Sequence, residues 1–175
     1  MAKAAGGRKA ARGITAAPPA DETALDLFGR MRWGALAVLS VAAMGIAAYL
    51  TYTHWTDQVV ACGGVGQCEE VQQSSYSAIA GVPVALLGGL AATALLSIAL
   101  GRLAGLALAV EWASLATLGL TTASVAFAAY LTYVELFVLE AICLYCVALA
   151  CIFTASWLIS LGDWFLTRDI SPEPG

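Results

Sequence analysis

The chain has 175 residues, of which 61 % are hydrophobic and only 11 % carry a charge. Soluble domains carry charge on about a quarter of their residues, so this composition excludes an ordinary soluble protein. The formal net charge of −4 says little about partners, because the predicted topology puts basic and acidic residues on opposite faces. No nucleic-acid partner is expected.

Residues 1–30 precede the first apolar segment and are predicted to form a disordered cytoplasmic tail. The stretch from Met1 to Ala20 is rich in Ala, Gly and Pro and has no apolar core, so no cleavable signal peptide is indicated. A membrane domain is expected over residues 31–162, followed by a short cytoplasmic tail at residues 163–175.

Four segments of this membrane domain have no charged side chain and are long enough to cross a bilayer as helices, which takes about 20 residues. They lie at about residues 33–53, 82–101, 112–134 and 141–162. Four such segments in one short chain favour membrane helices over the buried helices of a soluble core. The connection around Arg102 is short, which predicts antiparallel neighbours in an all-α four-transmembrane-helix bundle.

The positions of Lys and Arg predict the orientation of these helices, since cytoplasmic loops carry an excess of both residues. All eight fall before the first segment, between the second and third, or after the fourth: Lys3, Arg8, Lys9, Arg12, Arg30, Arg32, Arg102 and Arg168. They and both termini therefore share one face, expected to be the cytoplasmic face of a bacterial inner membrane. The extracytoplasmic face carries four of the five cysteines, and disulfides persist in that compartment.

The longest predicted loop, residues 55–81, connects the first two membrane segments and contains Cys62 and Cys68. The sequence Gly63-Gly64-Val65-Gly66 between these cysteines gives the loop flexibility. Helix-forming residues follow Cys68 and predict a short helix lying at the membrane interface. A turn comes next, and Pro83 is expected to open the second membrane helix.

Cys143 and Cys146 form a C-L-Y-C motif at the start of the fourth segment. Residues i and i+3 are neighbours on one helix face, and the unpaired N–H groups and dipole of a first helical turn favour a thiolate. A thiolate is the form that attacks disulfides, and an apolar quinone can dissolve in the hydrocarbon just below. The mobile Cys62 and Cys68 can exchange disulfides with a soluble partner and with this fixed pair.

Other interpretations of the cysteines are structural. Both pairs can be inert disulfides, or the four thiolates can bind zinc, with His54 as a further ligand. A zinc site outside the cytoplasm competes with oxidation, so no metal is predicted. Cys151 lies about two turns into the fourth helix and is expected to be a small buried hydrophobe.

Three segments, taken together with Cys62, resemble bacterial homologues of vitamin K epoxide reductase. They are C-E-E-V-Q-Q-S-S-Y at 68–76, G-V-P-V-A-L-L-G at 81–88 and E-L-F-V-L-E-A-I-C-L-Y-C at 135–146. The resemblance covers roughly residues 32–161. The disulfide-oxidising membrane enzyme DsbB is similar but carries its C-x-x-C early and its loop pair late, so the order here favours the epoxide reductase family.

This resemblance implies a four-helix bundle around a quinone of the ubiquinone, menaquinone or vitamin K type, which accepts electrons. It implies that Cys146 is the cysteine nearest the quinone, that Cys143 is its partner, and that Cys62 and Cys68 are the shuttle pair. Ser74 matches a serine that helps to position the loop segment over the site and to bind the quinone. Many bacterial members carry a fused thioredoxin-like domain; none is expected here, which implies a separate thioredoxin-fold (DsbA-like) partner outside the cytoplasm.

The sequence thus predicts a quinone-dependent protein-dithiol oxidoreductase that passes electrons from this partner through two cysteine pairs and so supports disulfide formation in exported proteins. One alternative is a reductase of vitamin K epoxide or quinone. Vertebrate members have a tyrosine four residues after the second C-x-x-C cysteine, where this chain has Ala150, which counts against epoxide chemistry. A second alternative is a non-catalytic protein with four membrane spans and structural disulfides.

Overall fold

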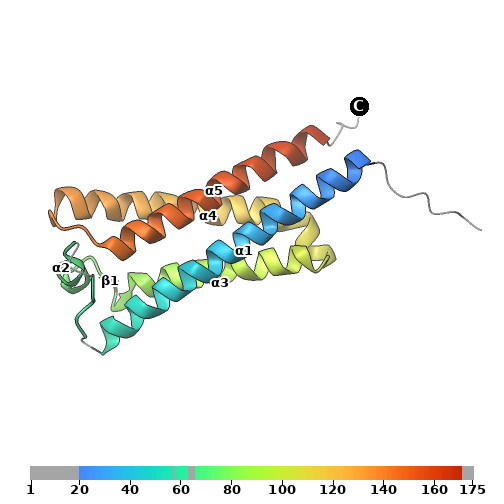
Figure 1. Cartoon of the computed structure of the whole chain (residues 1–175). Coiled ribbons are helices and arrows are strands. Elements are labelled where there is room, and N and C mark those ends of the chain that lie inside the picture. Colours follow the sequence, from blue (N-terminus) through green and yellow to red (C-terminus); the bar gives the residue numbers. More distant parts are fainter. Residues whose placement is uncertain (1–19, 57, 63–65, 171–175) are drawn as a thin grey trace, which may run out of the picture.

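The computed structural model describes residues 20–56, 58–62 and 66–170, and this part of the chain folds into five helices and a small sheet (Figure 1). The elements are α1 (Ala20–Trp55), α2 (Cys68–Gln73), β1 (Ala78–Ile79), β2 (Val82–Pro83), α3 (Val84–Leu103), α4 (Ala107–Phe137) and α5 (Leu144–Ile170). Parts of the tails predicted at 1–30 and 163–175 lie outside the described residues, namely 1–19, with its basic residues, and 171–175. Residues 63–65 of the glycine-rich loop also lie outside them.

Four helices are long and apolar enough to cross a membrane, over Leu27–Trp55, Val84–Leu103, Trp112–Phe137 and Leu144–Leu166. The four predicted segments fall on these helices, so the four-helix membrane bundle is confirmed. The short helix expected after Cys68 is α2. Two boundaries differ. The first helix, α1, begins at Ala20, so residues 20–30 are helical where a disordered tail was expected. The last helix, α5, continues to Ile170, whereas a tail was expected from residue 163.

The long helices pack as two close pairs, α1 with α3 and α4 with α5, and α5 also contacts α1 while α3 contacts α4. Small residues allow this approach: a Cβ added at Gly89 of α3 would lie 3.3 Å from the Cβ of Ala47 in α1. The outer surface exposes large apolar side chains, among them Val38, Val41, Leu90, Leu115 and Leu158. Such a surface suits contact with lipid.

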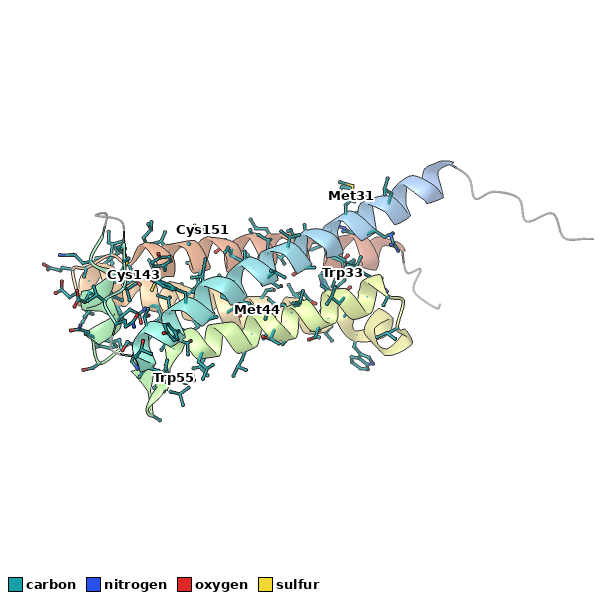
Figure 2. The ribbon with its side chains drawn as sticks, turned by 60° about the horizontal axis from the view of Figure 1, so that its bottom comes forward. Met31, Trp33, Met44, Trp55, Cys143 and Cys151 are labelled. Atoms are coloured by element: carbon teal, nitrogen blue, oxygen red, sulfur yellow. A yellow bond between two sulfur atoms is a disulfide. The ribbon has the colours of Figure 1, made fainter. Side chains whose placement is uncertain are left out.

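Cys151 belongs to this outer surface, which corrects the expectation that it is buried (Figure 2). It follows Cys146 by five residues, and five residues turn an α-helix by about 140° past its starting face. Cys146 faces inward, so Cys151 points away from the bundle.

The two ends of the bundle carry different elements, as Figures 1 and 2 show. The end that carries α2, the sheet and the α4–α5 connection, here called the cysteine end, is built on a buried cluster of Leu50, Val60, Cys68, Val71, Ala141 and Cys143. The opposite end, here called the Arg32 end, carries the α3–α4 connection and a second cluster of Trp33, Leu36, Ala99 and Ala113.

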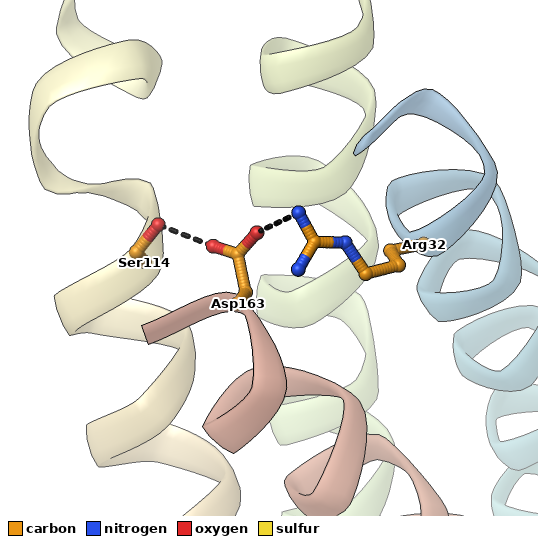
Figure 3. A network of polar contacts seen from close by, with 3 residues as sticks. All are labelled: Arg32, Ser114 and Asp163. Carbon is orange, nitrogen blue, oxygen red and sulfur yellow. Dashed lines mark hydrogen bonds and ion pairs between the residues drawn. The ribbon is translucent and has the colours of Figure 1, made fainter. Parts of the chain in front are cut away.

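An ion pair joins three helices at the Arg32 end (Figure 3). Arg32 of α1 lies 3.1 Å from the Asp163 carboxylate of α5, and the Ser114 hydroxyl of α4 donates to the other carboxylate oxygen at 2.5 Å. Asp163 is nearly buried. A buried charge is tolerated when it is paired and hydrogen-bonded, and both conditions hold here.

A tight turn leads into α3. β1 and β2 pair antiparallel, with Ala78 opposite Pro83, and the turn residues Ala80 and Gly81 have φ of 51° and 82°. Two successive positive φ values are typical of the type I′ hairpin turn. Pro83 follows and precedes the first residue of α3, close to its predicted place.

Candidate active site

Cys143 occupies the N-terminal cap of α5, immediately before its first helical residue. Its Sγ accepts a hydrogen bond from the backbone N–H of Cys146 at 3.4 Å, as a capping side chain does at the third residue of a helix. The Cys146 thiol also donates to this sulfur and, with the N–H groups of Cys146 and Tyr145, lowers the pKa of Cys143, although burial and the nearby Glu135 charge oppose this effect. The predicted thiolate preference of the motif therefore falls on Cys143.

Cys62 and Cys68 form a disulfide in the structure, with their Cα atoms 6.0 Å apart. Cys68 starts α2 and is fully buried, in the same cluster as Cys143, while Cys62 and Cys146 pack against that cluster. The fold thus brings together the four cysteines that the sequence singled out, and it places Cys68 and Cys143 in the shared interior.

Backbone contacts next to the cysteines hold the loop on the C-L-Y-C motif. The N–H of Gln67 donates to the carbonyl of Ile142 at 2.9 Å, joining the neighbours of Cys68 and Cys143. Gly66 makes this approach possible, because its φ is +88° and an added Cβ would lie only 2.7 Å from that carbonyl oxygen.

Two tyrosines hydrogen-bond to the backbone of Ala61, next to Cys62, on the other side of the loop. Tyr145 donates from its hydroxyl to the Ala61 carbonyl at 3.0 Å, and the Tyr49 hydroxyl accepts from the Ala61 N–H at 3.3 Å. The two rings lie 5.3 Å apart between centroids. Sequence reasoning did not single out either tyrosine and missed this contact. The separation in sequence hides it, although an aromatic residue inside the C-L-Y-C was a visible signal.

A cavity of about 350 Å³ lies beside the dithiol, between α3, α4 and α5 and below α2. Most of its wall is apolar. Its polar lining at the cysteine end comprises Gln72, Ser74, Tyr76, Ser77, Thr132, Glu135 and Cys146. Of the four paired cysteines, Cys146 is the one that lines it. The volume falls in the range of small-molecule sites.

Ser74, singled out by the sequence, lines this cavity at the end of α2. Its hydroxyl donates to the Val71 carbonyl at 2.7 Å, and its own carbonyl accepts from the Ser77 hydroxyl at 2.9 Å. The Ser77 carbonyl in turn accepts from the Val84 N–H at 2.9 Å, at the first residue of α3. Ser74 therefore belongs to a chain of hydrogen bonds that fixes the segment covering the cavity.

Glu135 is a site residue that sequence reasoning did not single out. It is 5 % exposed, and its carboxylate accepts the backbone N–H of Cys143 at 3.2 Å. The carboxylate also hydrogen-bonds with the Cys146 side chain. Glu135 thus touches both halves of the C-x-x-C, eight residues before it in the chain.

The zinc alternative gains no support from the geometry. Within residues 20–56, 58–62 and 66–170, no three His, Cys, Asp or Glu side chains gather closely enough to hold a metal ion. His54 instead lines a separate, more polar hollow with Glu69 and Gln73.

The model of one protein family, described as the vitamin K epoxide reductase family, matches residues 34–161. The matched region runs from the first membrane helix into the fourth and includes both cysteine pairs, α2, Glu135 and the cavity. It agrees with the resemblance seen in the sequence.

Proposed function

This chain belongs to the vitamin K epoxide reductase family, and we propose that it passes electrons from a protein dithiol, through Cys62–Cys68 and then Cys143–Cys146, to a quinone. As a member of this family, the chain is an integral membrane oxidoreductase, and proteins of the family use quinones. The finer assignment rests on one observation: Cys68 and Cys143 share a buried cluster, while Cys146 lines the cavity.

The cavity fits a quinone by its chemistry. Apolar side chains such as Leu131 and Phe153 form most of the wall, and hydroxyl groups of Ser74, Tyr76 and Thr132 lie at the cysteine end. The hydroxyls of Ser74 and Thr132 already donate to the carbonyls of Val71 and Ala128, so Tyr76 is the hydroxyl that can donate to an oxygen of a quinone head. The apolar wall accommodates the quinone ring. A bound quinone supplies an acceptor for two electrons and two protons.

The relay begins at Cys62, which is partly exposed, whereas Cys68 is fully buried. A thiolate of the donor protein attacks the Cys62 sulfur and breaks the Cys62–Cys68 bond, and a second donor thiol then displaces Cys62, leaving the donor oxidised and the loop pair reduced. The Cys68 thiolate next attacks Cys143 of the oxidised C-x-x-C. Cys62 closes the loop disulfide again, and Cys143 and Cys146 become the dithiol that faces the cavity.

We assign the donor to the thioredoxin fold and the cysteine end to the extracytoplasmic side of a bacterial inner membrane. Arg30 and Arg32 lie near the start of the first membrane helix, Leu27–Trp55, and Arg102 lies in the last turn of the second, all away from the cysteines. The excess of basic residues on the cytoplasmic side supports this orientation.

Quinone is a better substrate than an epoxide in this cavity. Ala150 lines the wall at the position where vertebrate members carry a tyrosine, so this position offers no hydroxyl to an epoxide oxygen.

The test compares Cys146→Ala with Cys62→Ala in purified protein, with a thioredoxin-fold protein or a small dithiol as donor and menaquinone or ubiquinone as acceptor. Absorbance should show no quinone reduction by Cys146→Ala with either donor. Cys62→Ala should lose reduction driven by the protein donor and keep reduction driven by the small dithiol. Equal and complete loss in both assays for both variants would contradict the relay.

A further inference from the structure

Glu135 borders both the dithiol and the cavity, and the electron relay itself makes no use of it. Among the described residues that line the cavity, it is the sole carboxylate, and none is Lys, Arg or His. Its carboxylate accepts a hydrogen bond from the Cys143 N–H and interacts with the Cys146 side chain. No ion pair in the described part of the chain involves it. A carboxyl group buried without a cation is costly when ionised, so this position favours a group that exchanges a proton.

Oxidation of the Cys143–Cys146 dithiol releases two electrons and two protons as the S–S bond forms. The protons need a route from sulfur to the electron acceptor, and the apolar wall of the cavity offers none. Close contacts supply one: the Cys146 side chain lies against both the Cys143 sulfur and the Glu135 carboxylate, and its single S–H can turn from one to the other. The three groups lie in series, and the last one borders the cavity.

We propose that Glu135 is the catalytic acid–base of this dithiol: its carboxylate takes the proton of Cys146 and releases it into the cavity toward the quinone. This inference rests on the proposed function. The second proton passes from Cys143 to the Cys146 sulfur and then to Glu135. The carboxyl group thus takes up and releases a proton twice and ends unchanged. Two electrons and two protons leave the dithiol, and the acceptor gains the same.

A purely structural role is separable from this one, because backbone bonds hold the α4–α5 connection independently of the side chain. The Ala141 N–H donates to the Glu135 backbone carbonyl at 3.1 Å, and the Leu139 N–H donates to Val134 at 2.9 Å. Glu135→Gln keeps an oxygen to accept the Cys143 N–H but cannot carry the proton. Glu140→Gln is the matched control, since Glu140 lies in the same connection and is exposed.

The first experiment mixes pre-reduced protein with menaquinone and follows a single turnover over a range of pH. General acid–base groups contribute about 100- to 10,000-fold, so Glu135→Gln should slow the step by a factor in that range and alter its pH profile. Glu140→Gln should match the wild type. The other titratable groups facing this site are Cys143, Cys146, Tyr76 of the α2–β1 segment and, in the reduced protein, Cys68, which shares a buried cluster with Cys143.

A second readout needs no quinone. Glu135→Gln should exchange with a small disulfide at a rate near wild type, which also shows that the variant is folded. Infrared difference spectra on oxidation by that disulfide should contain a carboxyl band that is absent in Glu135→Gln. Small carboxylic acids should partly restore quinone reduction in Glu135→Ala.

The outcomes are distinguishable from those of the proposed function. A wild-type rate of quinone reduction in Glu135→Gln overturns the inference and leaves the relay intact. Equal slowing of quinone reduction and of disulfide exchange also overturns it, because Glu135 would then only position Cys143. Wild-type protein that fails to reduce quinone defeats the proposed function first.

Discussion

The bundle buries an acidic side chain near each end, and the two side chains have different partners. Asp163 at the Arg32 end is about as buried as Glu135 at the cysteine end. Asp163 pairs with Arg32 and accepts from Ser114, whereas Glu135 contacts an amide N–H and a thiol. The same functional group thus locks three helices together at one end and is left able to exchange a proton at the other.

This comparison separates stability from chemistry. A charge with a cationic partner stays ionised, and removing the partner is costly. A buried carboxyl group whose partners are all neutral is suited to taking up and releasing a proton, and such groups cluster at functional sites. Substitutions at the Arg32 end should therefore act on folding, and those at the cysteine end on reaction rates.

The largest expected effect on folding is at Arg32. Arg32→Ala leaves the Asp163 carboxylate buried without its cation, and breaking a buried pair costs about 3–5 kcal/mol. Unfolding of purified protein in mixed detergent micelles should measure this loss. Arg30→Ala is the control, because Arg30 is exposed and surface substitutions usually change stability by less than about 0.5 kcal/mol. If both variants unfold alike, the Arg32–Asp163 pair does not lock the bundle.

Much of this architecture could be predicted from the sequence. Uncharged runs of sufficient length located the membrane helices, because the bilayer sets that length, and the spacing of Cys143 and Cys146 located the dithiol. The sequence could not predict the partners of Glu135, Tyr49 and Tyr145, since these contacts depend on how separate helices pack. Cys151 was misjudged for a related reason: a membrane helix is apolar all round, so its inward face is not marked by hydrophobicity.

At the cysteine end, a substitution at Gly66 should slow the reaction by displacing the loop. Gly66→Ala puts a Cβ 2.7 Å from the Ile142 carbonyl oxygen at a φ of +88°, and such strain costs about 1–3 kcal/mol. The loop should detach from the C-L-Y-C, and electron transfer from the reduced Cys62 and Cys68 to Cys143–Cys146 should slow by about 5- to 150-fold. Stopped-flow trapping of the thiols measures this rate.

The matched control is Gly105→Ala, in the α3–α4 connection at the Arg32 end. Gly105 also has a positive φ, of 72°, but an added Cβ meets nothing within 4 Å. It should carry the backbone strain without the slower exchange. Slow exchange in both variants would trace the effect to general destabilisation.

Tyr145→Phe should have a smaller effect, because it removes one hydrogen bond to Ala61 and keeps the ring against Tyr49. A hydrogen bond contributes about 0.5–1.5 kcal/mol. The equilibrium constant for docking of the loop should therefore fall by about two- to tenfold. Hydrogen exchange of the amides near Ala61 should report it. Tyr133→Phe, on an exposed tyrosine, should leave this exchange unchanged.

The smallest change concerns the titration of Cys143. Its pKa is lowered chiefly by the Cys146 thiol, so its thiolate should persist at pH values below the ordinary cysteine range and be lost only as the pH falls further. Cys146→Ala removes that hydrogen-bond donor, and the thiolate of Cys143 should then form only at higher pH. Ultraviolet absorbance of the thiolate, recorded against pH in protein that retains the Cys62–Cys68 disulfide, measures the shift. Cys151→Ser serves as the control, since Cys151 lies on the outer surface. An unchanged titration in Cys146→Ala would mean that the helix N-terminus alone sets the thiolate, and the two cysteines of the motif would then be chemically less coupled than their geometry indicates.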